Sequence, residues 1–495
     1  MRKYTKDGIK KLSLKLEARY FFIIPYTFIF SLSVLAFLEY PGQGHIYVVF
    51  TIASNVLFYF GFRKNAIFFD AFIGAFFWLG FWLKLTVRVA FMDGRFHEPI
   101  GSFSGSGAAF DQALLVASCG FLGLLTASYL REKLFFTYAD KSGQVEHVGL
   151  YRFYRSHRKT ILLGFVGLFI TIAATNLYFG FYQRGAVSRT SLPYGLGGIY
   201  SWLLLFGLAS ISALILHYEF LSNKTTTYFV VILSLIESFL TNVSLLSRGM
   251  ILNTSALAYG VIKNIKFNAI KTSLQFWIVI STIFILLFGF SIVLVNHLRS
   301  GNPIEYTNSY NIYRGVYNSV TGTSYMAKPL FLDRWVGIEG VMAVTSYPEQ
   351  GWKLWDNAWK ENRLHGATSF YDTYIITSPY KNMDATKYNY ISLPGIIAFC
   401  FYPGSFAFLF TCMFILGALA AAIEISVFKL GGGNIILCAL LAQVVAYRYA
   451  HFGYAPSQSY LLFGTLLLNL FIIYFSNKFL LYWNSRTVER AHLKS

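Results

Sequence analysis

Residues 272–296 read TSLQFWIVISTIFILLFGFSIVLVN, an apolar run of 25 residues without a charged side chain. The hydrocarbon core of a bilayer is about 30 Å thick and takes about 20 apolar residues of helix to cross. The run therefore predicts a membrane-spanning helix. Working outward from it, a scan at similar length finds eleven more apolar runs, the shortest at 250–264. The twelve expected helices cover residues 20–38, 46–62, 66–83, 112–130, 160–179, 197–218, 228–246, 250–264, 272–296, 404–428, 433–450 and 458–483.

The composition supports the same class of protein. Of the 495 residues, 56% are hydrophobic and only 13% are charged, with a mean hydropathy of +0.52. Soluble domains carry about 25% charged residues, so a soluble, disordered or fibrous chain is excluded. We expect an all-α polytopic membrane protein with about 12 transmembrane helices. The net charge of +19 is then better explained by basic cytoplasmic loops than by a nucleic-acid partner.

The distribution of Lys and Arg predicts the orientation. With the N-terminus in the cytoplasm, the inner segments hold 25 of the 41 basic residues, and nine of the other 16 lie in one long outer segment. Long translocated segments do not obey the positive-inside rule. We therefore expect both termini in the cytoplasm.

That outer segment, residues 297–394, divides the chain into an N-terminal bundle of about nine helices (1–296) and about three C-terminal helices (395–495). A structureless loop of this length is uncommon inside a compact domain, so we expect short helices in it. Residues 333–344 have a helical pattern. Trp352, Trp355 and Trp359 recur at helical spacing, which predicts an amphipathic helix at the membrane surface.

Several familiar catalytic signatures are absent. The sequence has no G-x-x-x-x-G-K-[ST], G-x-S-x-G or H-E-x-x-H, and no D-x-D that would hold a divalent metal on a sugar diphosphate. We accordingly expect neither direct use of ATP nor a bound cofactor or metal.

Arginines near the expected outer ends of helices are the distinctive residues. A guanidinium facing lipid costs a few kcal/mol, and it binds phosphate bidentately without losing its proton. Several of them converging on one outer cavity would hold a diphosphate without a metal. The alternative, for Arg189 and Arg448 above all, is that each reaches lipid headgroups singly. The arginines concerned are Arg184, Arg189, Arg248, Arg334 and Arg448.

Other ionisable residues are open to a structural or a functional interpretation. Glu237, inside the seventh helix, should pair across helices or line a cavity. Asp70 and Arg88 would be compatible with a structural pair. His451 follows Arg448 and is compatible with either an interfacial histidine or a base.

Three local patterns resemble the O-antigen and capsule polymerases of the Wzy type. Arg184 and Gly195 match an R-x10-G motif of an outer loop, and Ser247-Arg248-Gly249 is similar to a serine–arginine turn in which Gly249 follows the arginine. Leu393-Pro394-Gly395, running into residues 401–405, resembles the start of the helix after the large loop. The long segment departs from the pattern, because no arginine there has glycine at that interval; Arg334 with Gly337 and Gly340 is the nearest substitute.

The resemblance implies a GT-C-like membrane glycosyltransferase in a bacterial inner membrane, with its active site facing the periplasm. Its donor and acceptor would be glycans linked to undecaprenyl diphosphate, and a chain-length-regulating co-polymerase would be a possible partner. The acceptor hydroxyl would attack the anomeric carbon of the donor, and the arginines would neutralise the leaving diphosphate. The base would be Glu339, His451 or Asp333.

Three other functions remain open at this stage. A ligase would move the same lipid-linked glycan onto another acceptor. A flippase or secondary transporter typically has inverted repeats and paired broken helices, which we do not find. A membrane acyltransferase would need a histidine-based catalytic pair, which is not evident.

Overall fold

The computed structural model describes residues 26–96, 98–134, 138, 148–184, 187–223, 228–247, 249–267, 270, 272–299, 332, 334–361, 369–378, 392–452 and 456–492. Every regular element within these ranges is helical. Eight helices are long and apolar enough to cross a membrane. Three shorter helices are also apolar: Tyr26–Glu39, Tyr228–Ser244 and Ile435–Ala450.

A helix lies in each of the twelve ranges expected from the sequence, with some different ends. The twelfth helix, expected to end at residue 483, continues to His492, and the third, expected to end at residue 83, continues to Phe91. Lys84 and Arg88 therefore lie within a helix and not in the following loop. Both side chains are fully buried, and their acidic partners, described below, make this helical extension possible.

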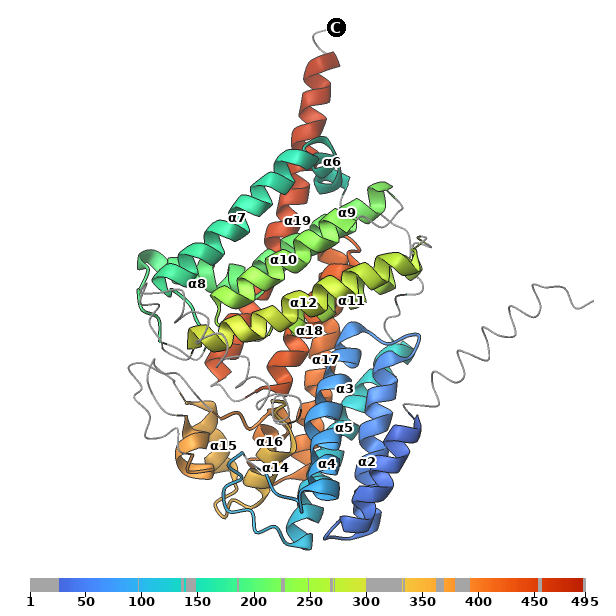
Figure 1. Ribbon diagram of the computed structural model, residues 1–495, viewed down its shortest axis with the longest axis vertical. Coiled ribbons are helices and arrows are strands. Elements are labelled where there is room, and N and C mark those ends of the chain that lie inside the picture. The colour runs from blue at the N-terminus through green and yellow to red at the C-terminus, as the bar shows by residue number, and fades with distance from the viewer. Residues whose placement is uncertain are drawn as a thin grey trace, which may run out of the picture.

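The N-terminal helices form one packed group around α5. Its members, after the helix Tyr26–Glu39, are α2 (Gly44–Phe62), α3 (Phe68–Phe77), the π-helix η1 (Trp78–Leu83), α4 (Lys84–Phe91) and α5 (Gly107–Leu134). The long apolar helix α17 (Phe406–Leu430) lies along α5, and α18 (Ile435–Ala450) packs against α3. This group occupies the lower right of Figure 1, with the helices running close to vertical.

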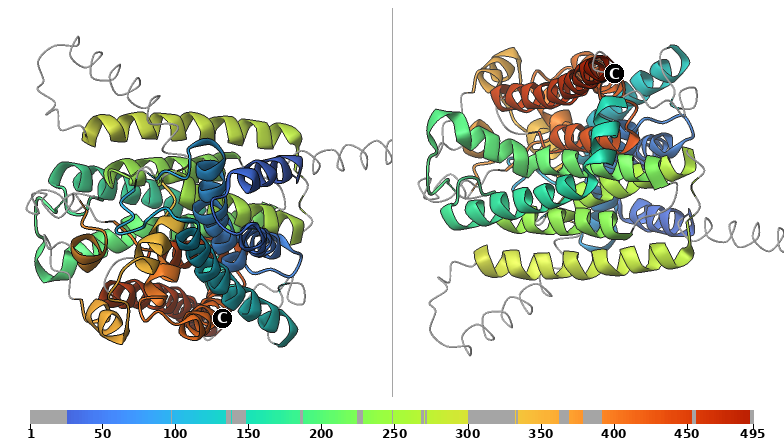
Figure 2. Two further views of the ribbon diagram at one scale, coloured as in Figure 1. Left: turned by 90° about the horizontal axis from the view of Figure 1, so that it is seen from below. Right: turned by 90° about the horizontal axis from the view of Figure 1, so that it is seen from above.

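A second group is inclined to the first (Figure 1). Its helices are α6 (Val148–Ser156), α7 (Arg158–Phe179), η3 (Pro193–Gly195), α8 (Leu196–Trp202), η4 (Leu203–Gly207), α9 (Leu208–Asn223), α10 (Tyr228–Ser244), α11 (Met250–Phe267), α12 (Leu274–Arg299) and α19 (Pro456–His492). Helix α18 joins the two groups because it also packs against α9 and α11. Helix α12 runs along the margin of the bundle (Figure 2), and only 11% of its apolar window is buried.

The long outer segment contributes short helices that pack into the bundle. They are α14 (Ile338–Thr345), α15 (Trp352–Trp359) and the π-helix η5 (Tyr371–Ile375), followed by α16 (Ile396–Cys400). Helix α14 packs against α5 and α16, and its residues 338–344 are all buried. Helix α15 is amphipathic, with Leu354 buried and Trp352 60% exposed. Residues 300–331 and 379–391 of this segment, which hold eight of its eleven tyrosines, lie outside the described part.

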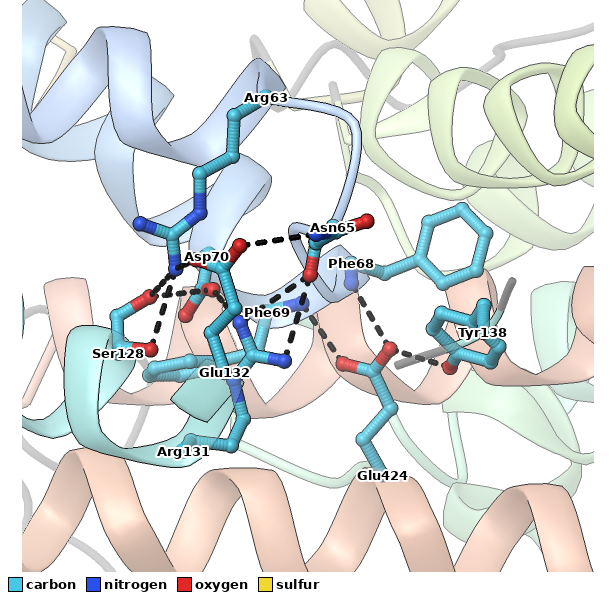
Figure 3. A network of polar contacts seen from close by, with 10 residues as sticks. All are labelled: Arg63, Asn65, Phe68, Phe69, Asp70, Ser128, Arg131, Glu132, Tyr138 and Glu424. Carbon is cyan, nitrogen blue, oxygen red and sulfur yellow. Dashed lines mark hydrogen bonds and ion pairs between the residues drawn. The ribbon is translucent and has the colours of Figure 1, made fainter. Parts of the chain in front are cut away.

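A polar network joins the C-terminal ends of α2 and α5, the start of α3 and Glu424 of α17 (Figure 3). Glu424 of α17 accepts hydrogen bonds of 2.8 Å from the backbone N–H groups of Phe68 and Phe69, and a further one from Tyr138. A carboxylate at this position satisfies two N–H groups of the first turn of α3 and faces the positive end of its dipole.

A second part of the same network involves Asp70. Its carboxylate is bound by Arg131 at 3.0 Å and by Ser128 at 2.6 Å, while Arg63 forms an ion pair with Glu132 at 3.0 Å. The expected pair of Asp70 with Arg88 is therefore wrong. The two residues are 18 positions apart on one continuous helix, which separates them by about 27 Å at 1.5 Å per residue.

Candidate functional site

Arg184 lies beside the turn that contains Arg248. The backbone N–H of Arg184 donates to the carbonyl of Leu245 at 2.9 Å, and its Nη1 lies 3.4 Å from Oγ of Ser247. A Cβ atom on Gly249 would lie 3.4 Å from the same Nη1. Arg184 therefore contacts the residues on either side of Arg248, whose own position lies outside the described residues.

The local backbone explains why Arg184 is held there. Asn176, fully buried near the end of α7, donates from Nδ2 to the carbonyls of Tyr182 (2.9 Å) and Ser244 (3.0 Å), and its Oδ1 accepts from the N–H of Tyr182 at 2.8 Å. One side chain thus joins the loop after α7 to the end of α10. The short loop carrying Arg184 is fixed against the turn at 245–249.

Arg299 is a neighbour that the sequence analysis did not single out. It is the last residue of α12, and its Nη2 donates to the carbonyl of Arg184 at 2.9 Å. The only sequence signal for Arg299 is that it follows the apolar run 272–296 by three residues. A basic residue at the end of a membrane helix is common, so this position alone did not indicate a site.

Arg334 joins these two arginines from the segment before α14. Its side chain is exposed to solvent, yet protein atoms around it lower the pKa of its guanidinium by desolvation, with Tyr447 acting in the opposite direction. The positive charges of Arg184 and Arg299 lower this pKa further. Arg184 and Arg299, from two other segments, therefore lie close enough to repel the guanidinium of Arg334, and an anion bound beside Arg334 would relieve that repulsion.

An aromatic group lies beside Arg334. Trp335 stacks on Phe76 with ring centroids 5.8 Å apart, and Phe76 meets Tyr447 edge-on at 5.9 Å. Tyr447 stacks on His451 at 4.0 Å. The rings come from α3, α18 and the segment before α14, so they hold these three segments together.

His451 is buried at the end of α18 and stays neutral at ordinary pH. The pKa of its imidazole is lowered to about 3, mainly by burial. The hydrogen bond to the Tyr447 carbonyl raises this pKa, whereas the charges of Arg334, Lys84 and Arg184 lower it. An imidazole that binds a proton so weakly is a poor general base at neutral pH. The same electrostatics place His451 within the field of the arginines.

Glu339 and Lys84 form a buried ion pair, and the charge of Lys84 acts on His451. Nζ of Lys84 lies 3.0 Å from Oε1 of Glu339 and 2.9 Å from Oε1 of Glu98. Oε2 of Glu339 is buried and has no hydrogen-bond partner among the described residues. Burial raises the pKa of Glu339, Lys84 opposes the rise, and Glu98 adds to it. Of the two expected bases that the structure describes, Glu339 and His451, Glu339 is the better candidate. Its pKa is raised toward neutrality, whereas that of His451 is lowered away from it.

Two close glycine contacts position α14 so that Glu339 reaches Lys84. A Cβ atom on Gly337 would lie 2.0 Å from the carbonyl oxygen of Gly80 in η1, and one on Gly340 would lie 1.9 Å from that of Pro394. Only glycine permits backbones to approach this closely. The π-helical turn η1, a feature that often occurs at functional sites, lies at the contact.

The remaining expected residues lie elsewhere or outside the described part. Arg448 donates to Oγ of Ser459 through Nε (3.1 Å) and Nη2 (2.9 Å) and lies over the ring of Phe452, so it joins α18 to α19. The exposed Arg189 packs against Gly180. Gly195 has φ +75° and precedes α8 without a non-local neighbour within 4 Å. Asp333 lies outside the described residues.

Glu237 is paired across helices as the sequence suggested. Its carboxylate is 1% exposed and accepts hydrogen bonds from Thr241 at 3.0 Å and from Ser212 of α9 at 3.4 Å. It takes no part in the arginine group.

The arrangement combines three cationic side chains, an aromatic group and a buried carboxylate with a free oxygen. Comparison with protein-family models, curated proteins and solved structures finds no match to this chain. The function proposed below therefore depends on the chemistry of the arranged residues.

Proposed function

We propose that this protein is a membrane glycosyltransferase that polymerises oligosaccharide repeat units carried on a polyprenyl diphosphate, undecaprenyl diphosphate in bacteria, into a surface polysaccharide. The twelve helices would all cross the membrane, with a GT-C-like arrangement and both termini in the cytoplasm. The site would face the periplasm, and a chain-length-regulating partner would be optional.

The observation that carries the proposal is the contact of Arg299 with Arg184 beside Ser247 and Gly249, with Arg334 close enough for both charges to lower the pKa of its guanidinium. Phosphate oxygens are the natural ligands of grouped guanidiniums. A diphosphate leaving group develops negative charge as its bond to the sugar breaks, and preorganised cations stabilise that charge most in the transition state. Neither ATP nor a metal is required, because the donor is already activated.

The reaction balances with groups on this chain. The acceptor hydroxyl attacks the anomeric carbon of the donor, its proton passes to Oε2 of Glu339, and a new glycosidic bond forms. The bond from the anomeric carbon to the phosphate oxygen breaks, and the lipid diphosphate leaves with the electron pair. The aromatic group at Trp335 and Tyr447 offers flat apolar faces of the kind that sugar rings contact.

The deciding experiment is an electrophoretic ladder of surface glycan from cells lacking this gene. We expect a single repeat unit on the acceptor and loss of the ladder. Polymer accumulating on the lipid carrier, with no glycan on the acceptor, would mean a ligase. Repeat units trapped at the cytoplasmic face would mean a flippase.

A further inference from the structure

The ion cluster of Lys84, Arg88, Glu98 and Glu339 has an arrangement that the reaction above does not yet use. Lys84 is fully buried and bridges two carboxylates, Glu98 from the loop after α4 and Glu339 from α14. Arg88 lies one helical turn beyond Lys84, with Nη2 3.9 Å from Oε2 of Glu98. Two buried cations and two acidic groups give a cluster without net charge.

The two oxygens of Glu339 are unequal in this cluster. Oε1 is held by Lys84, whereas Oε2 is buried without a partner among the described residues. A buried acceptor left unpaired is unfavourable, and such groups are expected to gain a donor in the working state. A hydroxyl group of the substrate is such a donor.

We propose that Lys84 and Glu98 are positioning residues that orient the Glu339 carboxylate and set its basicity for the acceptor hydroxyl. This inference rests on the proposed function. Lys84 fixes Oε1 and so directs Oε2 away from the cluster. Glu98 shares the charge of Lys84, so that the ammonium group does not bind Glu339 strongly enough to remove its proton affinity.

The charged and titratable groups around Glu339 come from four elements. Lys84 and Arg88 belong to α4, Glu98 to the loop that follows, and Tyr371 to η5, while His451 lies at the end of α18 within the field of Lys84. His451 is neutral, so Lys84 and Glu98 are the charges that act on Glu339 most directly. Their effects on its pKa have opposite signs.

This opposition provides a test that a purely structural role would not pass. Glu339 must be deprotonated to accept a proton, so its pKa sets the acid limb of the pH–rate profile. Lys84→Met removes a positive charge, raises that pKa and moves the acid limb to higher pH. Glu98→Gln removes a negative charge and moves the limb to lower pH. Each shift should be about one unit or more, the usual effect of a charge at this range.

The experiment measures kcat/KM against pH for the full-length protein in vesicles, with a lipid-linked repeat unit as substrate. The control variant is Lys360→Met on α15, which breaks an exposed ion pair with Asp356 and should leave the limb unchanged. In parallel, the infrared carbonyl band of protonated Glu339, assigned by its loss in Glu339→Gln, gives the same pKa without turnover.

The outcomes separate the two proposals. An inactive wild-type protein, or an active Glu339→Gln variant, would overturn the proposed function or its base. The positioning role alone would be overturned by a different result. In that case the wild type is active, Glu339→Gln is inactive, and the acid limbs of Lys84→Met and Glu98→Gln coincide with that of the wild type. If Lys84→Met does not fold, Glu98→Gln decides by itself, and an unchanged or upward shift of the infrared midpoint overturns the inference.

Discussion

Lys84 and Glu339 are 255 positions apart in the sequence and form an ion pair with Nζ 3.0 Å from Oε1, buried between the third helix and the long outer segment. The pair anchors a short helix of the outer segment inside the bundle. It also places Lys84 close enough to the end of α18 for its charge to act on His451.

Arg299 provides a test of the arginine group. We expect Arg299→Ala to reduce the rate of chain growth by about 100-fold, the usual effect of removing one donor to a developing charge. Arg299→Lys should recover only part of the rate, because an ammonium cannot bind two phosphate oxygens in parallel. The measurement is polymer formed per unit time in vesicles, with Lys360→Met as the charge-matched control. Full activity in Arg299→Ala would remove this residue from the site.

Arg248 should be at least as sensitive. Its neighbours Ser247 and Gly249 lie against Arg184. We expect Arg248→Ala to abolish chain growth in cells while the protein still inserts in the membrane, as judged by its level in isolated membranes. A normal glycan ladder from that variant would contradict the proposed role.

Gly337 tests how α14 is positioned. A Cβ atom at this position would lie 2.0 Å from the Gly80 carbonyl oxygen, so alanine forces the two backbones apart. We expect Gly337→Ala to lower both thermal stability and activity. Gly289→Ala in α12, where no non-local atom lies within 4 Å, should be neutral or stabilising by up to about 1 kcal/mol. Equal melting temperatures for the two variants would contradict the close contact.

A substitution at Glu424 tests the polar network drawn in Figure 3 independently of the site around Arg184. Glu424→Gln keeps one acceptor oxygen but loses the charge at the start of α3. We expect a loss of about 1–2 kcal/mol in stability, measured as thermal unfolding in detergent. Activity at a temperature where the variant is folded should equal that of wild type. Glu132→Gln, whose side chain is 26% exposed, is the milder control. A greater loss of stability in Glu132→Gln than in Glu424→Gln would mean that the hydrogen bonds of Glu424 to the start of α3 contribute little.

Chelation tests the proposed metal-free mechanism. Because cationic side chains would carry the diphosphate charge, the rate of chain growth should be unchanged by EDTA. A rate lost in EDTA and restored by Mg²⁺ would show that a divalent cation neutralises the leaving group instead.

The sequence by itself determined the membrane class of the chain and the approximate positions of the twelve apolar helices, but not α6. Both follow from local properties: an apolar run such as 272–296 is long enough to span a bilayer whatever surrounds it. The amphipathic helix at Trp352–Trp359 followed from helical spacing. The helix expected over 333–344 begins only at Ile338.

Only the tertiary structure decided which polar residues meet. Asp70 binds Arg131 and not Arg88, Arg448 binds Ser459 apart from the other arginines, and Arg299 joins Arg184. These pairings depend on how helices far apart in sequence cross and where their ends come to lie, and no local pattern encodes that. The buried pair of Lys84 and Glu339 exists because glycines at positions 80 and 337 let two backbones touch, which is a property of the packed bundle.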